Sequence, residues 1–248
     1  MGTVKSKETT ICGLAAVRAQ FAADASAIKR LFFDFQTGRK IGVMCKALAQ
    51  AKKVYRCVEP PELEKIAGTI HHGGIVAVIA AAELRAPAEG APREWARKKQ
   101  PLVVLDGVGN AHNLGAIART AAFFGVPRLI LLDAAAAALP NDAAHRVAEG
   151  GLAHLEVFRV RELPRFLHEL AAAGYEVVGA ATRGGRPGAF GAHGKAIALV
   201  VGNEERGLSP EVAAACTSLV TIPGAGKVES LNVSVAAAVL MWELIARG

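Results

Sequence analysis

The chain has 248 residues, which is enough for one large domain or two modest ones, each with a buried core. Hydrophobic residues make up 52% and charged residues 21%, which excludes a disordered chain, and no apolar run approaches the ~20 residues of a membrane span. The 29 Lys and Arg residues exceed the 22 Asp and Glu residues, and the net charge of +7 favours a polyanionic partner such as nucleic acid.

The N-terminal "MGTVKSKETT" is polar and lacks the apolar centre of a signal peptide. The four cysteines are scattered, with no C-x-x-C pair and no His at zinc-ligand spacing. We therefore expect a cytoplasmic protein with reduced thiols, no membrane segment and no metal site.

Residues 1–82 alternate between patterns typical of helices and of strands, as in a small α/β domain. Helices are predicted at 11–21, 40–51 and 61–68, and strands at 28–35, 54–59 and 73–81. Residues 83–100, "ELRAPAEGAPREWARKKQ", contain two prolines and no apolar period, so we predict a linker there.

Residues 101–248 repeat strand and helix patterns, with predicted strands at 102–105, 128–132, 175–181, 196–201 and 218–222. Short apolar runs of this kind are typical of strands buried on both faces, and the alternation predicts a parallel sheet covered by helices. Ligands of such sheets bind at the carboxyl ends of the strands, so the loops after these strands are the first candidates for a site.

Three of those loops are rich in Gly, Asn, Glu and Arg: "LDGVGNAHNLGAIARTA", "LVVGNEERGLS" and "TIPGAGKVESLNVSVA". In the first, Asn113 is expected to cap a helix that carries Arg119 one turn further on. In the second, Gly202 allows backbone to approach a ligand and Glu204 can accept hydrogen bonds. None of the three is a phosphate-binding loop or a dinucleotide fingerprint.

The stretch "ESLNVSVAAAV" at 229–239 fits two structures. Its alternating polar and apolar residues have the period of a strand, yet the residues that follow read as a helix. We interpret it as a loop entering the last helix, with Ser230 as a cap and with Val235, Val239 and Trp242 on one helical face. Ser234 has no assigned role.

Together, "HNLGAIART", "VVGNEERGL" and "IPGAGKVESLNVSVA" resemble the three signature motifs of the SpoU (TrmH-like) RNA 2′-O-ribose methyltransferases of the SPOUT superfamily. "ICGLAAV" and "HHGGIVAV" resemble, more loosely, the RNA substrate-binding domain that precedes the catalytic domain in many members. The layout is similar to that of the YfiF-type branch. Three positions depart from the usual motifs: Asn110-Ala111 replaces Asp-Pro, Gly224 replaces Met, and "HHGGI" has an extra Gly.

The resemblance implies an α/β fold whose C-terminal parallel-sheet domain ends in a deep trefoil knot. It also implies a homodimer that binds S-adenosylmethionine and methylates a ribose 2′-hydroxyl of ribosomal or transfer RNA, without a metal. The cofactor-binding positions fall on Gly202, Ile222 and Leu231, with Asn203, Pro223 and Gly226 beside them. The catalytic positions fall on Asn113, Arg119, Glu204, Ser230 and Asn232.

The resemblance gives Arg119 the role of base, but a guanidinium gives up its proton only with great difficulty, so we favour a clamp on an RNA phosphate; both roles stay open. Ten basic residues are candidates for tracking the RNA backbone: Arg18, Lys29, Arg30, Arg39, Lys40, Lys52, Lys53, Arg97, Lys98 and Lys99. Two other functions compete with methyl transfer. One is an RNA-binding module of the same fold without catalysis. The other is a nucleotide-dependent oxidoreductase, which the absent glycine fingerprint disfavours.

Overall fold

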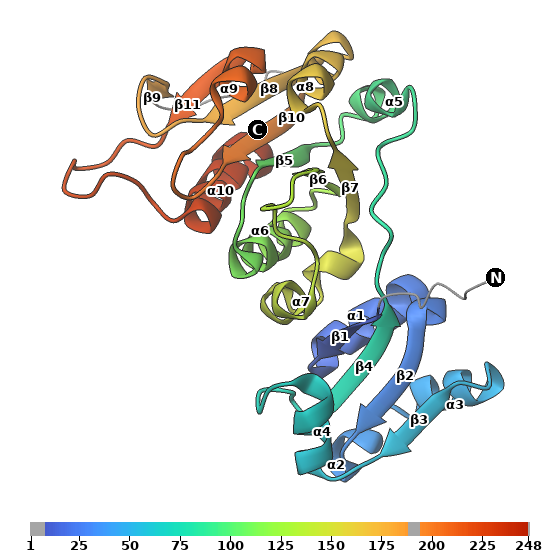
Figure 1. Cartoon of the computed structure of the whole chain (residues 1–248). Coiled ribbons are helices and arrows are strands. Elements are labelled where there is room, and N and C mark those ends of the chain that lie inside the picture. The colour runs from blue at the N-terminus through green and yellow to red at the C-terminus, as the bar shows by residue number, and fades with distance from the viewer. Residues whose placement is uncertain (1–7, 188–193, 248) are drawn as a thin grey trace.

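The structure is a computed structural model that describes residues 8–187 and 194–247. It contains a four-stranded sheet built from the N-terminal part of the chain and a seven-stranded sheet built from the C-terminal part (Figure 1). Among the described residues, no helix is long and apolar enough to cross a membrane.

The four-stranded sheet has the order β1-β4-β2-β3 and is mixed. Strand β4 (Ile75–Ala80) runs antiparallel to β1 (Glu8–Cys12) and to β2 (Ile28–Phe33), whereas β3 (Val54–Cys57) runs parallel to β2. The other elements of this unit are α1 (Leu14–Asp24), η1 (Ala25–Ala27), α2 (Phe35–Gly38), α3 (Gly42–Gln50) and α4 (Pro60–Ala67).

The apolar run of β4 is buried on both faces because helices cover both sides of the sheet. Successive side chains of a strand point to opposite faces. Ile75, Ala77 and Ile79 pack in one cluster with residues of α1 and α3, while Val76 packs with residues of α4. The N-terminal part therefore has its own apolar core.

The prediction of a helix from residue 11 was wrong at its start. Residues 8–12 form β1, and α1 begins only at Leu14, after Gly13 turns the chain with a φ of +90°. The segment "ICGLAAV" is apolar enough to fit either period, and pairing with β4 selects the strand by supplying backbone hydrogen-bond partners.

The seven-stranded sheet has the order β7-β6-β5-β10-β8-β11-β9, and every neighbouring pair in it is parallel. Its strands are β5 (Leu102–Asp106), β6 (Arg128–Leu132), β7 (Glu156–Val160), β8 (Tyr175–Ala180), β9 (Arg186–Pro187), β10 (Ala196–Gly202) and β11 (Ser218–Thr221). The helical segments are α6 (Ala111–Phe123), α7 (Asp142–Ala148), η2 (Gly151–His154), α8 (Leu163–Ala172), α9 (Pro210–Ala215), α10 (Val233–Met241) and the π-turn η3 (Trp242–Ala246).

Helices cover both faces of this sheet, as the sequence predicts. Val103 and Leu105 of β5 pack in the cluster that contains α6 and α10, whereas Leu102 and Val104 pack in the cluster that contains α8 and α9. The five predicted strands correspond to β5, β6, β8, β10 and β11. Two strands were missed. Strand β7 is the half-exposed edge strand beside β6 and carries Glu156 and Arg159, and β9 has only two residues.

Residues 83–100 are not an unanchored linker as predicted, because they contain helix α5 (Ala91–Arg97). Trp95 is only 5% exposed and packs with the core of the seven-stranded sheet, and the Arg128 guanidinium lies 4.5 Å from its ring centroid. One aromatic residue in an otherwise polar segment therefore anchors it, a contact that periodicity cannot reveal.

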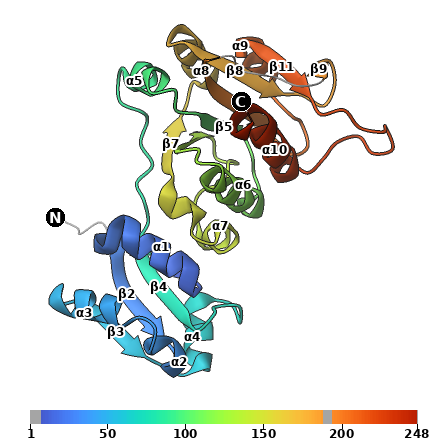
Figure 2. The same ribbon diagram turned by 180° about the vertical axis from the view of Figure 1, so that it is seen from behind.

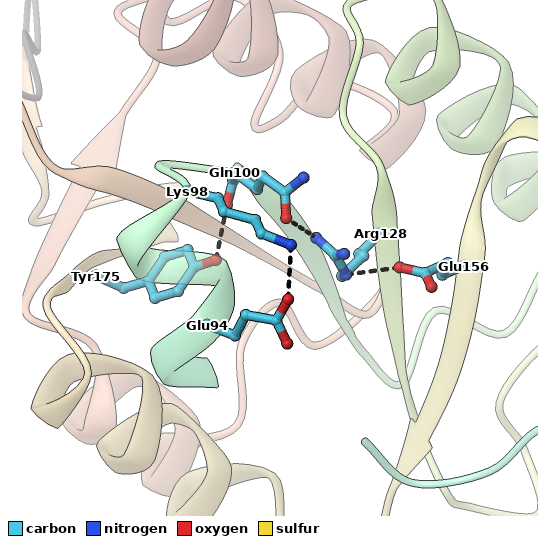
Figure 3. Close-up of polar contacts among 6 residues, drawn as sticks. All are labelled: Glu94, Lys98, Gln100, Arg128, Glu156 and Tyr175. Atoms are coloured by element: carbon cyan, nitrogen blue, oxygen red, sulfur yellow. Dashed lines mark hydrogen bonds and ion pairs between the residues drawn. The ribbon is translucent and has the colours of Figure 1, made fainter. Parts of the chain in front are cut away.

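Polar contacts complete this anchor at the amino ends of the strands (Figure 3). Gln100 Oε1 accepts a 2.8 Å hydrogen bond from Arg128, whose Nε lies 2.8 Å from Glu156 Oε2. The Tyr175 hydroxyl donates to the Gln100 carbonyl at 2.7 Å, and Lys98 pairs with Glu94 within α5. Arg128, Glu156 and Tyr175 are each the first residue of a strand.

The two parts of the chain touch through α7, which lies beside α1 in both ribbon views (Figures 1 and 2). The Thr9 hydroxyl and the Thr10 N–H of β1 both donate to Asp142 Oδ1 at the start of α7. The domain boundaries at 82 and 100 stay a prediction.

Candidate active site

The candidate site begins where β5 and β10 end side by side. Gly202, the last residue of β10, is in register with Asp106, the last residue of β5. The loops that follow both strands therefore leave the sheet from neighbouring points, at the edge where parallel sheets bind ligands. Buried Asp106 also accepts a 2.7 Å hydrogen bond from Ser209 N, which ties the start of α9 to the same edge.

Gly202 has no room for a side chain. A Cβ at this position would lie 2.1 Å from the carbonyl carbon of Gly207 and 2.3 Å from Leu208 N. The chain folds back tightly because Asn203 and Gly207 exchange two 2.9 Å backbone hydrogen bonds. The tight loop therefore requires glycine at position 202, and the same loop carries Glu204.

Glu204 joins the loops after β5 and β10. Its carboxylate accepts hydrogen bonds from Gly109 N at 3.2 Å, from Asn110 N at 3.3 Å and from Asn113 Nδ2 at 2.7 Å. Asn203 Nδ2 donates across the same junction, to the Gly107 carbonyl at 2.8 Å. The acid is therefore a structural centre of the site as well as a charge.

The third loop joins this network through Asn232. Asn232 Nδ2 donates to Asn113 Oδ1 at 3.1 Å, so Glu204, Asn113 and Asn232 form one hydrogen-bonded row drawn from the three motif segments. Asn232 Oδ1 accepts from the N–H and the hydroxyl of Ser234, which gives Ser234 a structural role. The row brings together residues separated by more than 90 positions in the chain.

Both predicted helix caps were wrong. Asn110, not Asn113, caps α6 by accepting from His112 N, and Asn113 lies inside the first turn with its amide free to bridge Glu204 and Asn232. Asn232, not Ser230, caps α10. The interpretation of 229–239 as a loop entering a helix is confirmed, because no strand crosses 230–235. In each case the capping residue is the Asn immediately before the helix, a position that is visible only once the helix start is known.

The environment of Glu204 keeps it ionised. Partial burial raises the pKa of its carboxyl group, but hydrogen bonds from Asn113 and from the Gly109 and Asn110 N–H groups outweigh burial, and the net pKa is lowered. At neutral pH the site therefore holds a carboxylate that accepts and does not donate.

A cavity of about 620 Å³ opens among these loops. Its walls include seven of the residues singled out from the sequence: Gly202, Asn203, Glu204, Ile222, Ser230, Leu231 and Asn232. Val201, Val220 and Leu240 supply further apolar surface. Pro223 and Gly226, on the loop after β11, do not line it. A larger cavity of about 870 Å³ lies between the two units, beside Asp142.

Arg119 is not part of the hydrogen-bonded row. Its Nη2 lies 3.0 Å from Glu149 Oε2, and both side chains are more than half exposed. Arg119 thus forms an ion pair with an acid that the motifs do not contain. The structure places one of the five candidate catalytic side chains apart from the other four.

An apolar surface begins at Phe123, one helical turn after Arg119 in α6. Val235, Val239 and Trp242 are 48%, 42% and 52% exposed, and Phe123 at the end of α6 is 83% exposed. The ring of Phe124 lies 5.2 Å from that of Phe123 and 5.9 Å from that of Trp242, which joins the residues of α6 and η3 into one patch. The predicted helical face is confirmed, and it faces outward.

Sequence reasoning missed the backbone donors at Gly109 and Asn110, and it missed Glu149. Backbone N–H groups carry no residue signature, and Glu149 follows a helix outside all three motifs. Among the described residues, no group of three His, Cys, Asp or Glu side chains is placed to hold a metal ion.

Comparison with known proteins agrees with this geometry. The model of the SpoU rRNA methylase family matches residues 100–242, which include all three loops. The chain belongs to the SpoU rRNA methylase family. A second family model, described as RNA 2′-O ribose methyltransferase substrate binding, matches residues 10–85 and thus the four-stranded sheet.

Several members of the SpoU family are similar over most of their length. The chain is 32% identical to an uncharacterized tRNA/rRNA methyltransferase, YfiF, of Escherichia coli O157:H7, over 96% of this chain and 68% of that protein. It is 34% identical to a 23S rRNA (guanosine-2′-O-)-methyltransferase, RlmB, of Ralstonia nicotianae, over 97% and 96%. The crystal structure of the SpoU methyltransferase AviRb from Streptomyces viridochromogenes in complex with AdoMet superposes with a TM-score of 0.72, at 25% identity, over 97% and 89%.

Proposed function

We propose that this protein transfers a methyl group from S-adenosylmethionine to a ribose 2′-hydroxyl of ribosomal or transfer RNA in the cytoplasm. The observation that carries the proposal is a hydrogen-bonded row at the carboxyl edge of the sheet, in which Asn113 joins Glu204 and Asn232, and these two residues line a 620 Å³ cavity. Membership of the SpoU family and the substrate-binding match over residues 10–85 support RNA as the substrate class.

The cavity suits this cofactor in size and chemistry. Its volume lies within the range of ~300–1,000 Å³ that is usual for small-molecule sites. Ile222 and Leu231 offer apolar walls for an adenine ring, and the close packing at Gly202 keeps the backbone of the 202–207 loop at the cavity wall. We assign Ile222, Leu231 and Gly202 to cofactor contacts and Asn203 to support of the loop. Pro223 and Gly226 belong to the backbone beside the cavity.

When bound, S-adenosylmethionine supplies a methyl carbon made electrophilic by its sulfonium, so the protein mainly orients the acceptor oxygen and excludes water. Asn113 and Asn232 carry amide groups that can hold the ribose, and Glu204 fixes the amide of Asn113 by accepting from its Nδ2. Ser230 lies on the same wall and adds a hydroxyl. Each of these groups orients the acceptor without changing its own charge.

Arg119 is the group that we assign to the RNA phosphate. A guanidinium is a cation with a planar fork of N–H donors, which suits a clamp better than a base, and its field favours loss of the 2′-hydroxyl proton. Arg119→Lys keeps the charge but loses the fork, so the clamp predicts a large loss of methylation. A near-normal rate for that variant would contradict it.

We propose that the active protein is a homodimer with the trefoil knot of the SpoU fold. The patch of Phe123, Val235, Val239 and Trp242 is too apolar for a surface that faces water in isolation, and it lies beside the catalytic helix α6. Val239→Glu is expected to give a monomer in sedimentation velocity, with loss of methylation. A monomeric wild-type protein would refute the dimer.

Two experiments test the activity itself. Calorimetry with S-adenosylmethionine separates an enzyme from an RNA-binding module, since the module would bind RNA but not the cofactor. Mapping of 2′-O-methyl sites across total RNA from cells with and without the protein identifies the target. We expect at least one site to disappear with the protein, and an unchanged map would exclude the proposed reaction on cellular RNA.

A further inference from the structure

We infer that Glu149 is a positioning residue for Arg119. The unit that contains the four-stranded sheet, here called the RNA-binding domain, holds Glu149 in place through helix α7. The inference rests on the proposed function, because it assumes that Arg119 contacts RNA. None of the three signature motifs includes Glu149, which lies between α7 and η2.

Glu149 occupies a fixed backbone position. It is the C-cap of α7 and adopts the left-handed conformation, with φ 44° and ψ 42°, which is uncommon for a residue other than glycine. Its carboxylate lies 3.0 Å from Arg119 Nη2. A guanidinium has five N–H donors in a planar fork, so this contact leaves the other edge of Arg119 open for a phosphate.

The turn that carries Glu149 is pressed directly against the backbone of Arg119. A Cβ on Gly151 would lie 2.8 Å from Arg119 Cα and 3.0 Å from the Ala118 carbonyl oxygen. One turn earlier in α6, a Cβ on Gly115 would lie 2.5 Å from the carbonyl oxygen of Ala144 in α7. Helices α6 and α7 are therefore packed backbone to backbone, and Glu149 cannot shift independently of the helix that carries Arg119.

The RNA-binding domain contacts the chain at the start of α7 and just past its end. At its start, Thr9 and Thr10 of β1 donate to Asp142 Oδ1. Just past its end, Gly150 lies under α1, where an added Cβ would come within 3.0 Å of Ala19 Cβ and 3.2 Å of Ala16 Cα. The domain that binds substrate thus holds both the helix and the turn that orient Arg119, which gives RNA docking a direct mechanical connection to the reacting site.

Glu149→Ala tests the positioning role in a single-turnover assay that follows labelled methyl transfer to unmodified ribosomal RNA transcripts. Because the ion pair is exposed, we expect a rate three- to fivefold lower, with the dissociation constant for RNA unchanged. Glu149→Gln keeps an acceptor for Nη2 and should recover part of the rate. Glu156→Ala is the matched control, since Glu156 has the same 59% side-chain exposure and pairs with Arg128 far from the cavity.

A double-mutant cycle ties the effect to Arg119. In the Arg119→Ala background, Glu149→Ala should cause no further loss. Thr9→Val removes one interdomain hydrogen bond and should lower the rate in the same direction, but not when Glu149 is already Ala. A wild-type rate for Glu149→Ala would overturn the inference, and so would a faster rate or tighter RNA binding, which would mean that Glu149 shields Arg119. Absence of transfer by the wild-type protein would instead refute the proposed function.

Discussion

In the seven-stranded sheet, the amino ends and the carboxyl ends of the strands carry polar clusters with opposite properties. At the amino ends, Arg128 is buried, stacks on Trp95 and is held by Gln100 and Glu156, so that its polar groups serve the packing of α5 (Figure 3). At the carboxyl ends, Glu204 is exposed and lines an open cavity, and half-buried Asn113 donates a hydrogen bond to its carboxylate. The same strands thus have a stabilising end and a functional end, and substitutions should separate the two.

The largest effect is expected at Gly202, on the carboxyl end. Gly202→Ala places a methyl group 2.1 Å from a backbone carbon, so the 203–207 loop has to move and the cavity wall is lost. We expect no measurable binding of S-adenosylmethionine by calorimetry and no methyl transfer. Gly224→Ala is the control, because a Cβ there meets nothing within 4 Å, and equal binding by the two variants would disprove the steric argument.

Trp95→Ala should give the largest effect at the amino end. Loss of this buried ring costs about 3–5 kcal/mol of unfolding free energy and removes the stacking partner of Arg128. Urea denaturation measures the loss. Because the cavity lies at the other end of the strands, the dissociation constant for S-adenosylmethionine should stay unchanged at temperatures where the variant is folded, and a weaker cofactor affinity would show that the two ends are coupled.

Glu204→Ala should lower the rate of methyl transfer and leave the free energy of unfolding nearly unchanged, which is the reverse of the pattern expected for Trp95→Ala. Removal of the acceptor for Gly109, Asn110 and Asn113 releases three groups that shape the site, and a misplaced group costs about 10²-fold in rate. Single-turnover methyl transfer measures this loss. Stability should fall by less than about 1 kcal/mol, since the side chain is exposed. A large stability loss with normal transfer would assign Glu204 to folding alone.

The pH dependence of Glu204 follows from its lowered pKa. A carboxyl group whose pKa is lower in the folded state stabilises that state above its unfolded pKa, and the contribution disappears as pH falls through the folded pKa. The difference in melting temperature between wild type and Glu204→Gln should therefore be largest near neutral pH and vanish in acid. A difference that grows toward low pH would contradict the direction of the shift.

Tyr175→Phe is expected to have the smallest effect. It removes the 2.7 Å hydrogen bond to the Gln100 carbonyl, at a cost of about 1 kcal/mol, and keeps the buried ring. Denaturation should detect this change, and methyl transfer should not. Loss of activity in this variant would mean that the amino end is more than an anchor.

The sequence by itself determined five strands of the seven-stranded sheet and most of the site. Apolar runs bounded by Gly and polar residues predict β5, β6, β8, β10 and β11, because buried parallel strands need no polar face. The same logic places Glu204, Asn113 and Asn232 after strands, where residues distant in the chain converge. Strand β1 escaped because the apolar segment at its end fits a helix as well as a strand, β7 because its exposed and half-buried residues do not alternate, and β9 because it has only two residues.

Only the tertiary structure decided which partners the polar groups have. Arg119 pairs with Glu149, which lies outside all three motifs. Asn110 and Asn232 hold the capping positions that were predicted for Asn113 and Ser230, and Trp95 anchors a segment that was predicted to be a linker. A hydrogen bond or an ion pair depends on atoms within about 3 Å, and a one-dimensional pattern fixes the face on which a residue lies but not its distance to a neighbour.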